Sequence, residues 1–177
     1  SYCMDVFSIQ TNALARRWEH THAETLVLGI SGGLDSTLAL LVCVQTADLL
    51  GYDRERIIGV TMPGFGTSDR TYQNALQMME QLGITHREID ICDITTQHLN
   101  SIAHDLDNHD ITYENAQARM RTLILMNLAN ELNGLVVETG DLSELALGWA
   151  TYCGDQMSMY GVNAGIPKTL VKYMVRY

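Results

Sequence analysis

The sequence predicts an α/β protein built on an open parallel sheet with helices on both faces. Three observations support this prediction: short apolar runs alternate with helical segments, the first run opens into a loop of glycine and serine, and polar loops follow two later runs. Strands that are joined through helices pair in parallel with right-handed crossovers. The carboxyl ends of such strands share one edge of the sheet, and ligands bind at that edge.

The first predicted unit is a strand, a tight loop and a helix, preceded by a lead-in helix. Apolar residues at helical spacing predict the lead-in helix over residues 3–20. The short apolar run at 25–30 is typical of a strand, and a small-residue turn follows it. A helix over 36–50 comes next and ends at Gly51, because glycine is a common helix stop.

The second unit begins with a strand over 57–62, which Pro63 ends. Thr67 or Ser68 is suited to cap the next helix, because a hydroxyl accepts from the free N–H groups of a first turn. That helix runs to a stop at Gly83.

The remaining elements follow the same alternation. Residues 86–91 alternate in polarity, which predicts a half-exposed third strand. Helices are expected over 94–104 and 114–132, with a polar loop between them. The fourth strand is expected over 135–138, and a second polar loop follows it.

The composition bounds the class of protein. A length of 177 residues with 46% hydrophobic residues favours one domain with a real core. The net charge of −10 argues against nonspecific nucleic-acid binding, which needs basic patches. No apolar stretch is long enough to cross a membrane, no secretion leader is visible, and the four cysteines are widely spaced. We therefore expect a cytoplasmic protein without nucleic-acid or membrane partners.

The loop after the first strand carries the strongest chemical signal. Ser31-Gly32-Gly33-Leu34-Asp35-Ser36 joins the strand to a helix start, where hydroxyls and free N–H groups can hold phosphates. The loop contains no lysine and lacks the Gly-Lys-Ser/Thr ending of the common phosphate loop. Asp35 indicates an accompanying metal, because a carboxylate alone would repel phosphates. An ordinary Gly-Gly turn is the alternative interpretation.

This loop resembles the pyrophosphate loop of the ATP pyrophosphatases, which implies an adenine-nucleotide alpha hydrolase-like fold. Four further motifs together resemble NAD synthetase, and most closely the synthetase domain of its large glutamine-dependent form. These motifs are Glu114–Arg121, Thr139–Glu144, Gly154–Ser158 and Asn163–Thr169. The resemblance runs from about residue 24 onward and implies that residues 1–177 form a single, partial synthetase domain. The glutaminase domain and the C-terminal part of the synthetase domain would then be absent.

The resemblance implies a carbon–nitrogen ligase that adenylates deamido-NAD with ATP and amidates it with ammonia from glutamine. It assigns ATP to Gly29, Ser31, Gly32, Gly33, Asp35, Ser36, Met62, Thr139 and Lys168. It assigns deamido-NAD to Asn115, Arg121, Glu144, Trp149, Thr151 and Tyr152. Asp35 and Glu144 would hold Mg²⁺, and Asp35 and Lys168 would be catalytic. The implied partners are a glutaminase domain in the full-length chain and further copies of the synthetase domain.

Several residues keep a structural alternative. Arg119 and Arg121 cannot share one helix face well, and we favour Arg121 as the functional one. Lys168 could instead complement a helix end, and Trp149 could be core. Glu138 stands before the Thr-Gly-Asp motif, where its carboxylate either points into solvent or crowds a phosphate. Two other functions also stay open: an amidating ligase such as GMP synthetase, and a non-catalytic nucleotide-binding module.

Overall fold

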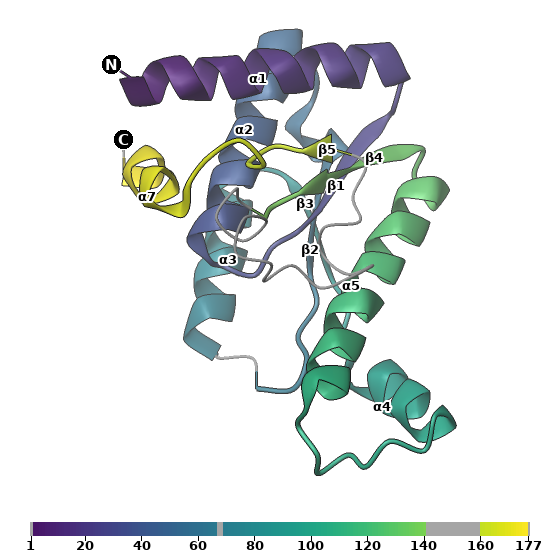
Figure 1. The fold of residues 1–177 in the computed structure, drawn as a ribbon. Helices are drawn as coiled ribbons and strands as arrows, with labels where there is room; N and C mark the ends of the chain where they lie inside the picture. Colours follow the sequence, from purple (N-terminus) through teal and green to yellow (C-terminus); the bar gives the residue numbers. More distant parts are fainter. Residues whose placement is uncertain (1, 67–68, 141–159, 177) are drawn as a thin grey trace.

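The computed structural model describes residues 2–66, 69–140 and 160–176 and confirms the predicted class. Its strands form one parallel sheet in the order β3-β2-β1-β4-β5 (Figure 1). The strands are β1 Thr25–Gly29, β2 Ile57–Thr61, β3 Thr85–Glu88, β4 Gly134–Glu138 and β5 Tyr160–Gly161. The helices are α1 Tyr2–Thr21, α2 Leu34–Leu50, the 3₁₀ turn η1 Arg54–Arg56, α3 Asp69–Leu82, α4 Cys92–Ser101, α5 Ile111–Glu131 and α7 Lys168–Arg176.

Helices cover both faces of the sheet, as predicted. Leu26 and Leu28 of β1 point into a core shared with α1, α2, α3 and α7. Val27 lies between them in sequence and points to the other face, where it packs in a second core with α5. This alternation follows from the period of two along a strand, and Figure 1 shows α5 on the opposite side of the sheet from α2. Among the described residues, no helix is both long and apolar enough to cross a lipid bilayer.

The third strand is shorter than predicted. β3 ends at Glu88 rather than at residue 91, although the chain keeps bonding to its neighbour. The Ile89 and Ile91 N–H groups donate to the carbonyls of Thr61 and Pro63. Pro63 has no N–H to donate in return, so the regular ladder stops at this point.

The helix boundaries after β3 also differ from the prediction, for local reasons. α4 begins at Cys92, whose N–H donates to the Asp90 carboxylate at 2.7 Å, and it ends before Ala103, which has a φ of 54°. α5 begins at Ile111 because Asp110 caps it and accepts from the Tyr113 N–H at 3.0 Å. That backbone hydrogen bond is the main reason why the pKa of Asp110 lies below its usual range.

β5 was not predicted, because a strand of two residues leaves no periodic pattern. It pairs with the end of β4, with Val137 opposite Tyr160 and Glu138 opposite Gly161. The predicted caps Thr67 and Ser68 lie outside the described residues.

An arginine clasp closes the end of the sheet away from the β1–α2 loop. Arg56 donates to the carbonyls of Glu24 and Ala23, at 2.6 and 3.2 Å, just before β1. Its guanidinium lies 4.0 Å from the centre of the Tyr52 ring and 5.2 Å from the Trp18 ring. The clasp therefore ties the start of β2 to the start of β1 and to α1.

Removing this clasp should destabilise the fold without touching the candidate site. We expect Arg56→Ala to lower the free energy of unfolding by about 2 kcal/mol, because charge-assisted hydrogen bonds and cation–π contacts are lost together. Arg56→Lys keeps a cation over the rings but loses the planar fork, so about half of the loss is expected. Urea unfolding measures both variants. If Arg56→Ala stays within about 0.5 kcal/mol of the wild type, the clasp contributes little.

Candidate active site

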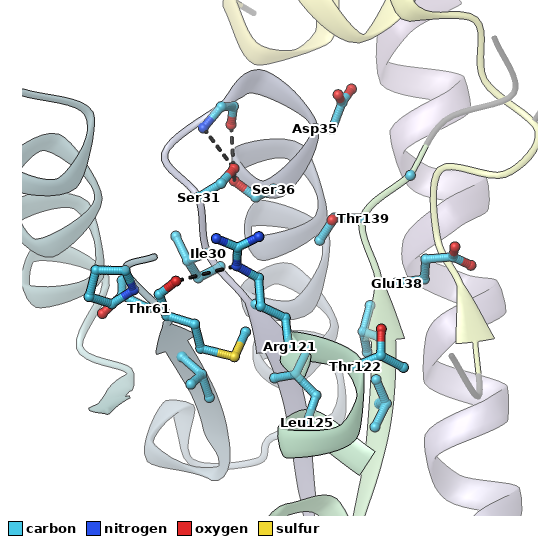
Figure 2. A pocket seen from close by; sticks show the side chains of 18 of the residues that line it. Ile30, Ser31, Asp35, Ser36, Thr61, Arg121, Thr122, Leu125, Glu138 and Thr139 are labelled. Atoms are coloured by element: carbon cyan, nitrogen blue, oxygen red, sulfur yellow. Dashed lines mark hydrogen bonds between the residues drawn. The ribbon is translucent and has the colours of Figure 1, made fainter. Parts of the chain in front are cut away.

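The main pocket of the described part of the chain lies at the carboxyl edge of the sheet and has a volume of about 480 Å³. The ends of β1, β2 and β4 contribute to its walls, together with side chains from α3 and α5. Figure 2 shows these segments converging on one space. The sheet edge and its three loops were predicted from the sequence to form the ligand site, and the structure brings them together.

The β1–α2 loop presents hydroxyls and backbone N–H groups to this pocket. The Gly33 N–H donates to Ser31 Oγ at 3.2 Å, and Ser36 Oγ donates to the Gly33 carbonyl at 3.1 Å. The two serine hydroxyls lie 3.3 Å apart. Gly33 is the N-cap of α2 and makes no side-chain capping bond. The first turn of a helix has N–H groups without intrahelical acceptors, so an anion at this point would be held by them.

Gly32 holds this loop in a conformation that suits only glycine. Its φ is +85°, and a Cβ at this position would lie 2.5 Å from the Thr71 carbonyl oxygen. The loop is therefore pressed against the first turn of α3. Gly32 does not itself line the pocket, although Ser31 and Gly33 beside it do.

The two residues predicted to be catalytic meet in the structure. Lys168 Nζ lies 3.1 Å from Asp35 Oδ2, joining the start of α7 to the first turn of α2. The Asp35 side chain is only 19% exposed, so this pair is better shielded than an ordinary surface ion pair. Asp35 also lines the pocket. Its carboxylate thus carries a positive partner at the point where phosphates are expected.

The donor set is consistent with part of a magnesium site. Mg²⁺ prefers one or two carboxylates and completes its shell with phosphate oxygens and water. Asp35 supplies one such carboxylate at the pocket. Among the residues that the structure describes, no three or more histidine, cysteine, aspartate or glutamate side chains are grouped so that they could hold a metal ion. The second predicted ligand, Glu144, lies outside the described residues.

The opposite half of the pocket has apolar walls that include Met62 and Leu125, and we call it the apolar slot. Both side chains pack against Gly29, since a Cβ there would lie 3.2 Å from Met62 Cε and 3.4 Å from Leu125 Cδ1. Arg121 Nε donates to the Met62 carbonyl at 3.3 Å, and its guanidinium points toward Ser31 and Ser36 (Figure 2). A slot with apolar walls suits a planar ring, and the polar loop beside it suits phosphates. The pocket is therefore shaped for a nucleotide.

Glu138, the last residue of β4, and Thr139, which follows it, lie at the same pocket. Both line it, and the Thr139 side chain points into it in Figure 2. The Glu138 carboxylate points the other way, toward β5, where a Cβ on Gly161 would lie 3.2 Å from its Oε2. Glu138 is therefore directed away from the phosphate loop.

Not every predicted residue reaches the pocket. Asn115 is half-buried on α5 but does not line it, and Arg119 is exposed on the same helix. Lys168 does not line it either and lies next to it only through its pair with Asp35. Arg121, which we favoured over Arg119, does line it. The predicted residues Glu144, Trp149, Thr151 and Tyr152 lie outside the described residues.

The sequence analysis also missed residues that the structure places at the site. Leu125 follows Arg121 by four positions on α5, so helical periodicity from Arg121 could have pointed to it but was not used. Tyr72 comes from the first turn of α3 and left no such signal. Cys43 on α2 and Cys92 on α4 do not resemble activated nucleophiles. Burial raises the pKa of the Cys43 thiol, and burial together with Asp90 raises the pKa of the Cys92 thiol.

Fold and pocket together define the class: an α/β protein whose pocket lies at the carboxyl edge of a parallel sheet, beside the loop that follows the central strand. The family model described as NAD synthase matches residues 6–177. The chain therefore belongs to the NAD synthase family, as the sequence motifs predicted.

Relatives and solved structures agree with this assignment. A glutamine-dependent NAD(+) synthetase of Mycobacterium leprae is 47% identical over 180 residues, covering 99% of this chain and 26% of the relative. The enzyme of that name from Thermotoga maritima is 37% identical over 156 residues, covering 87% of this chain and 26% of the relative. This chain thus spans about a quarter of the length of the curated relatives it matches.

Solved structures share the fold over almost the whole chain. A glutamine-dependent NAD+ synthetase from Acinetobacter baumannii, in complex with ADP, superposes with a TM-score of 0.93 at 29% identity, covering 100% of this chain and 33% of that one. An NMN synthetase from Francisella tularensis superposes with a TM-score of 0.85 at 26% identity, covering 97% of this chain and 70% of that one. These matches do not favour the GMP synthetase alternative.

Proposed function

We propose that this chain is the ATP-binding and adenylating part of a glutamine-dependent NAD synthetase. The observation that carries the proposal is that one pocket joins the Ser31–Ser36 loop to the apolar slot of Met62 and Leu125, with Lys168 held beside the pocket by Asp35. A triphosphate on the loop and a base in the slot would use all three. The ADP bound to the Acinetobacter baumannii relative supports an adenine nucleotide as the ligand.

The proposed reaction has two steps. A carboxylate oxygen of the nicotinate group of deamido-NAD attacks the α-phosphorus of ATP. The bond from that phosphorus to the bridging oxygen breaks, and pyrophosphate leaves. Ammonia then attacks the activated carbonyl carbon, AMP leaves with the former carboxylate oxygen, and the nitrogen loses a proton to give the amide. No side-chain nucleophile is needed, which agrees with the raised pKa values of Cys43 and Cys92.

The chain's own residues would bind and orient the nucleotide. N–H groups at the start of α2 and the Ser31 and Ser36 hydroxyls would hold the departing pyrophosphate. Lys168, already next to Asp35, would offset the charge that builds up on the phosphates. Bound Mg²⁺, held by Asp35 and, as we propose, by Glu144, would neutralise phosphate charge during the displacement.

The rest of the proposal concerns the second substrate and the longer chain. We propose that Arg121 and Asn115 on α5, with Glu144, Trp149, Thr151 and Tyr152, contact deamido-NAD. The name of the Mycobacterium leprae relative supports glutamine as the ammonia source in a longer chain. A glutaminase domain, assembly through the synthetase domain and a cytoplasmic location remain predictions.

Exchange of labelled pyrophosphate into ATP tests the adenylating step. With Mg²⁺ and deamido-NAD present and ammonia absent, reversal of the first step should carry label into ATP. Exchange that depends on deamido-NAD supports the proposal. ATP binding without any exchange would favour the non-catalytic module instead.

Lys168→Met should slow this exchange at least about tenfold, because the cation beside Asp35 is lost while the length of the side chain is kept. Lys172→Met is the matched control, since Lys172 is a likewise exposed lysine one turn further along α7, whereas Lys168 is the lysine that lies 3.1 Å from Asp35. The control should exchange at the wild-type rate. Equal rates for both variants would limit Lys168 to its ion pair with Asp35, without a role in catalysis.

A further inference from the structure

A buried amide joins two backbone segments at the pocket. Asn163, on the turn between β5 and α7, is completely buried. Its Nδ2 group donates to the carbonyl of Asp35 at 3.0 Å and to the carbonyl of Thr139 at 3.2 Å. Asp35 belongs to the first turn of α2, and Thr139 follows β4. One side chain therefore joins two segments that both line the pocket.

The rest of the sheet does not tie these two segments together. The paired register of β1 and β4 runs from Thr25 opposite Gly134 to Val27 opposite Val136. Beyond that point β1 leads into α2 on one face, while β4 has arrived from α5 on the other. The strand order changes direction between β1 and β4, and such a switch point opens a crevice. The Asn163 amide bridges this opening.

The two carbonyls fix the orientation of the Asn163 amide, and its other end is bonded as well. Its Oδ1 accepts from Gln10 Nε2 at 3.1 Å, and the same Gln10 group donates to the Val162 carbonyl at 3.0 Å. A flipped amide would place Oδ1 against two carbonyl oxygens and would lose the bond from Gln10. The network is buried, so each lost bond would leave a polar group without water to replace it.

We propose that Asn163 is a positioning residue that sets the separation between the phosphate loop and Thr139. The proposal rests on the proposed function, because the ligand held between these segments is taken to be the triphosphate of ATP. Asn163 does not line the pocket and acts through the backbone of Asp35 and Thr139. Its two hydrogen bonds hold the loop hydroxyls, the Asp35–Lys168 pair and the Thr139 side chain in one arrangement. An arrangement that is already formed does not have to be ordered when ATP binds.

This role predicts a loss that is selective for phosphates. The slot formed by Gly29, Met62 and Leu125 receives no bond from Asn163, so contacts with the base should survive its replacement. In the proposed complex, the β- and γ-phosphates of ATP lie on the Ser31–Ser36 loop. AMP lacks both of these phosphates and therefore depends less on the position of the loop. We therefore expect Asn163→Ser to weaken ATP binding about tenfold and AMP binding less than threefold, because one or two charge-assisted contacts are displaced.

Calorimetric titration of ATP and AMP with Mg²⁺, together with urea unfolding, tests this prediction. Gln10→Met is the matched control: it removes two bonds of the same buried network but leaves both donations from Asn163 in place. It should lose stability and keep its affinity for ATP. Asn163→Asp is the second variant, because it keeps the shape and the bond from Gln10 but turns an acceptor toward the two carbonyls. It should show the same selective loss as Asn163→Ser.

Three results would overturn the proposal. The first is wild-type affinity for ATP in the Asn163 variants. The second is an equal loss of ATP and AMP binding in those variants, and the third is the same selective loss in Gln10→Met, since either would mean a general structural role.

A readout without ligand separates this proposal from the proposed function. In Asn163→Ser, the backbone amide resonances of Asp35, Ser36, Thr139 and Gly140 should shift together, while Gln10→Met should leave them in place. If the wild type failed to bind ATP, the proposed function would fail, and the amide resonances alone would still decide whether Asn163 holds the two segments. Unshifted resonances in Asn163→Ser would contradict the positioning role.

Discussion

Gly32→Ala is expected to abolish ATP binding and to lower the free energy of unfolding by about 2 kcal/mol or more, because two costs combine. The residue has a φ of +85°, where a side chain is strained. In addition, the new Cβ would lie 2.5 Å from the Thr71 carbonyl oxygen, and a backbone atom cannot move as easily as a side-chain tip. The Ser31–Ser36 loop must therefore shift away from α3 and lose the arrangement that receives phosphates.

Gly51→Ala separates the two costs. Gly51, just beyond the other end of α2, also has a positive φ of 69°, but a Cβ there would meet nothing within 4 Å. This variant should lose about 1 kcal/mol of stability from strain and bind ATP like the wild type. Calorimetry with ATP and Mg²⁺ and urea unfolding measure both variants. Normal ATP affinity in Gly32→Ala would mean that the loop does not hold the phosphates.

Asp35→Ala is expected to remove the dependence of ATP binding on Mg²⁺. The carboxylate lines the pocket at the first turn of α2 and lies beside the Lys168 ammonium. Without it, the metal would lose a protein ligand, and repulsion between carboxylate and phosphates would also disappear. Affinity for ATP with Mg²⁺ should fall about tenfold or more, while affinity in the presence of a chelator should stay equal or rise.

Asp48→Ala is the control on the same helix. Asp48 forms a surface ion pair with Arg54 at 2.7 Å, away from the pocket, and the Arg54 hydrogen bond lowers the pKa of this carboxyl. Its loss should leave both titrations unchanged. If Asp35→Ala keeps the full response to Mg²⁺, Asp35 does not hold the metal, and its role is limited to the pair with Lys168.

The sequence was sufficient to predict the layers of the fold and the edge that carries the site. Alternating strands and helices leave few arrangements of a parallel sheet, so the loops after β1, β2 and β4 had to meet. The residues with distinctive local chemistry, such as Ser31, Asp35 and Thr139, were found because their loops directly follow apolar strands.

What the sequence could not predict depends on contacts between distant segments. The pairing of Asp35 with Lys168 and the bonds of Asn163 join α2 to the last described helix and to the turn before it. No local periodicity encodes such contacts. The edge strand β3 and the two-residue β5 were misjudged for a related reason, since their limits are set by the neighbouring backbone rather than by their own residues.

The most direct test of the central claim is calorimetric titration of this chain with ATP and Mg²⁺, followed by deamido-NAD or xanthosine monophosphate. If the pocket belongs to an NAD synthetase, ATP binds in a Mg²⁺-dependent manner and the second titration favours deamido-NAD. Absence of ATP binding, or a preference for xanthosine monophosphate, would contradict the proposed function.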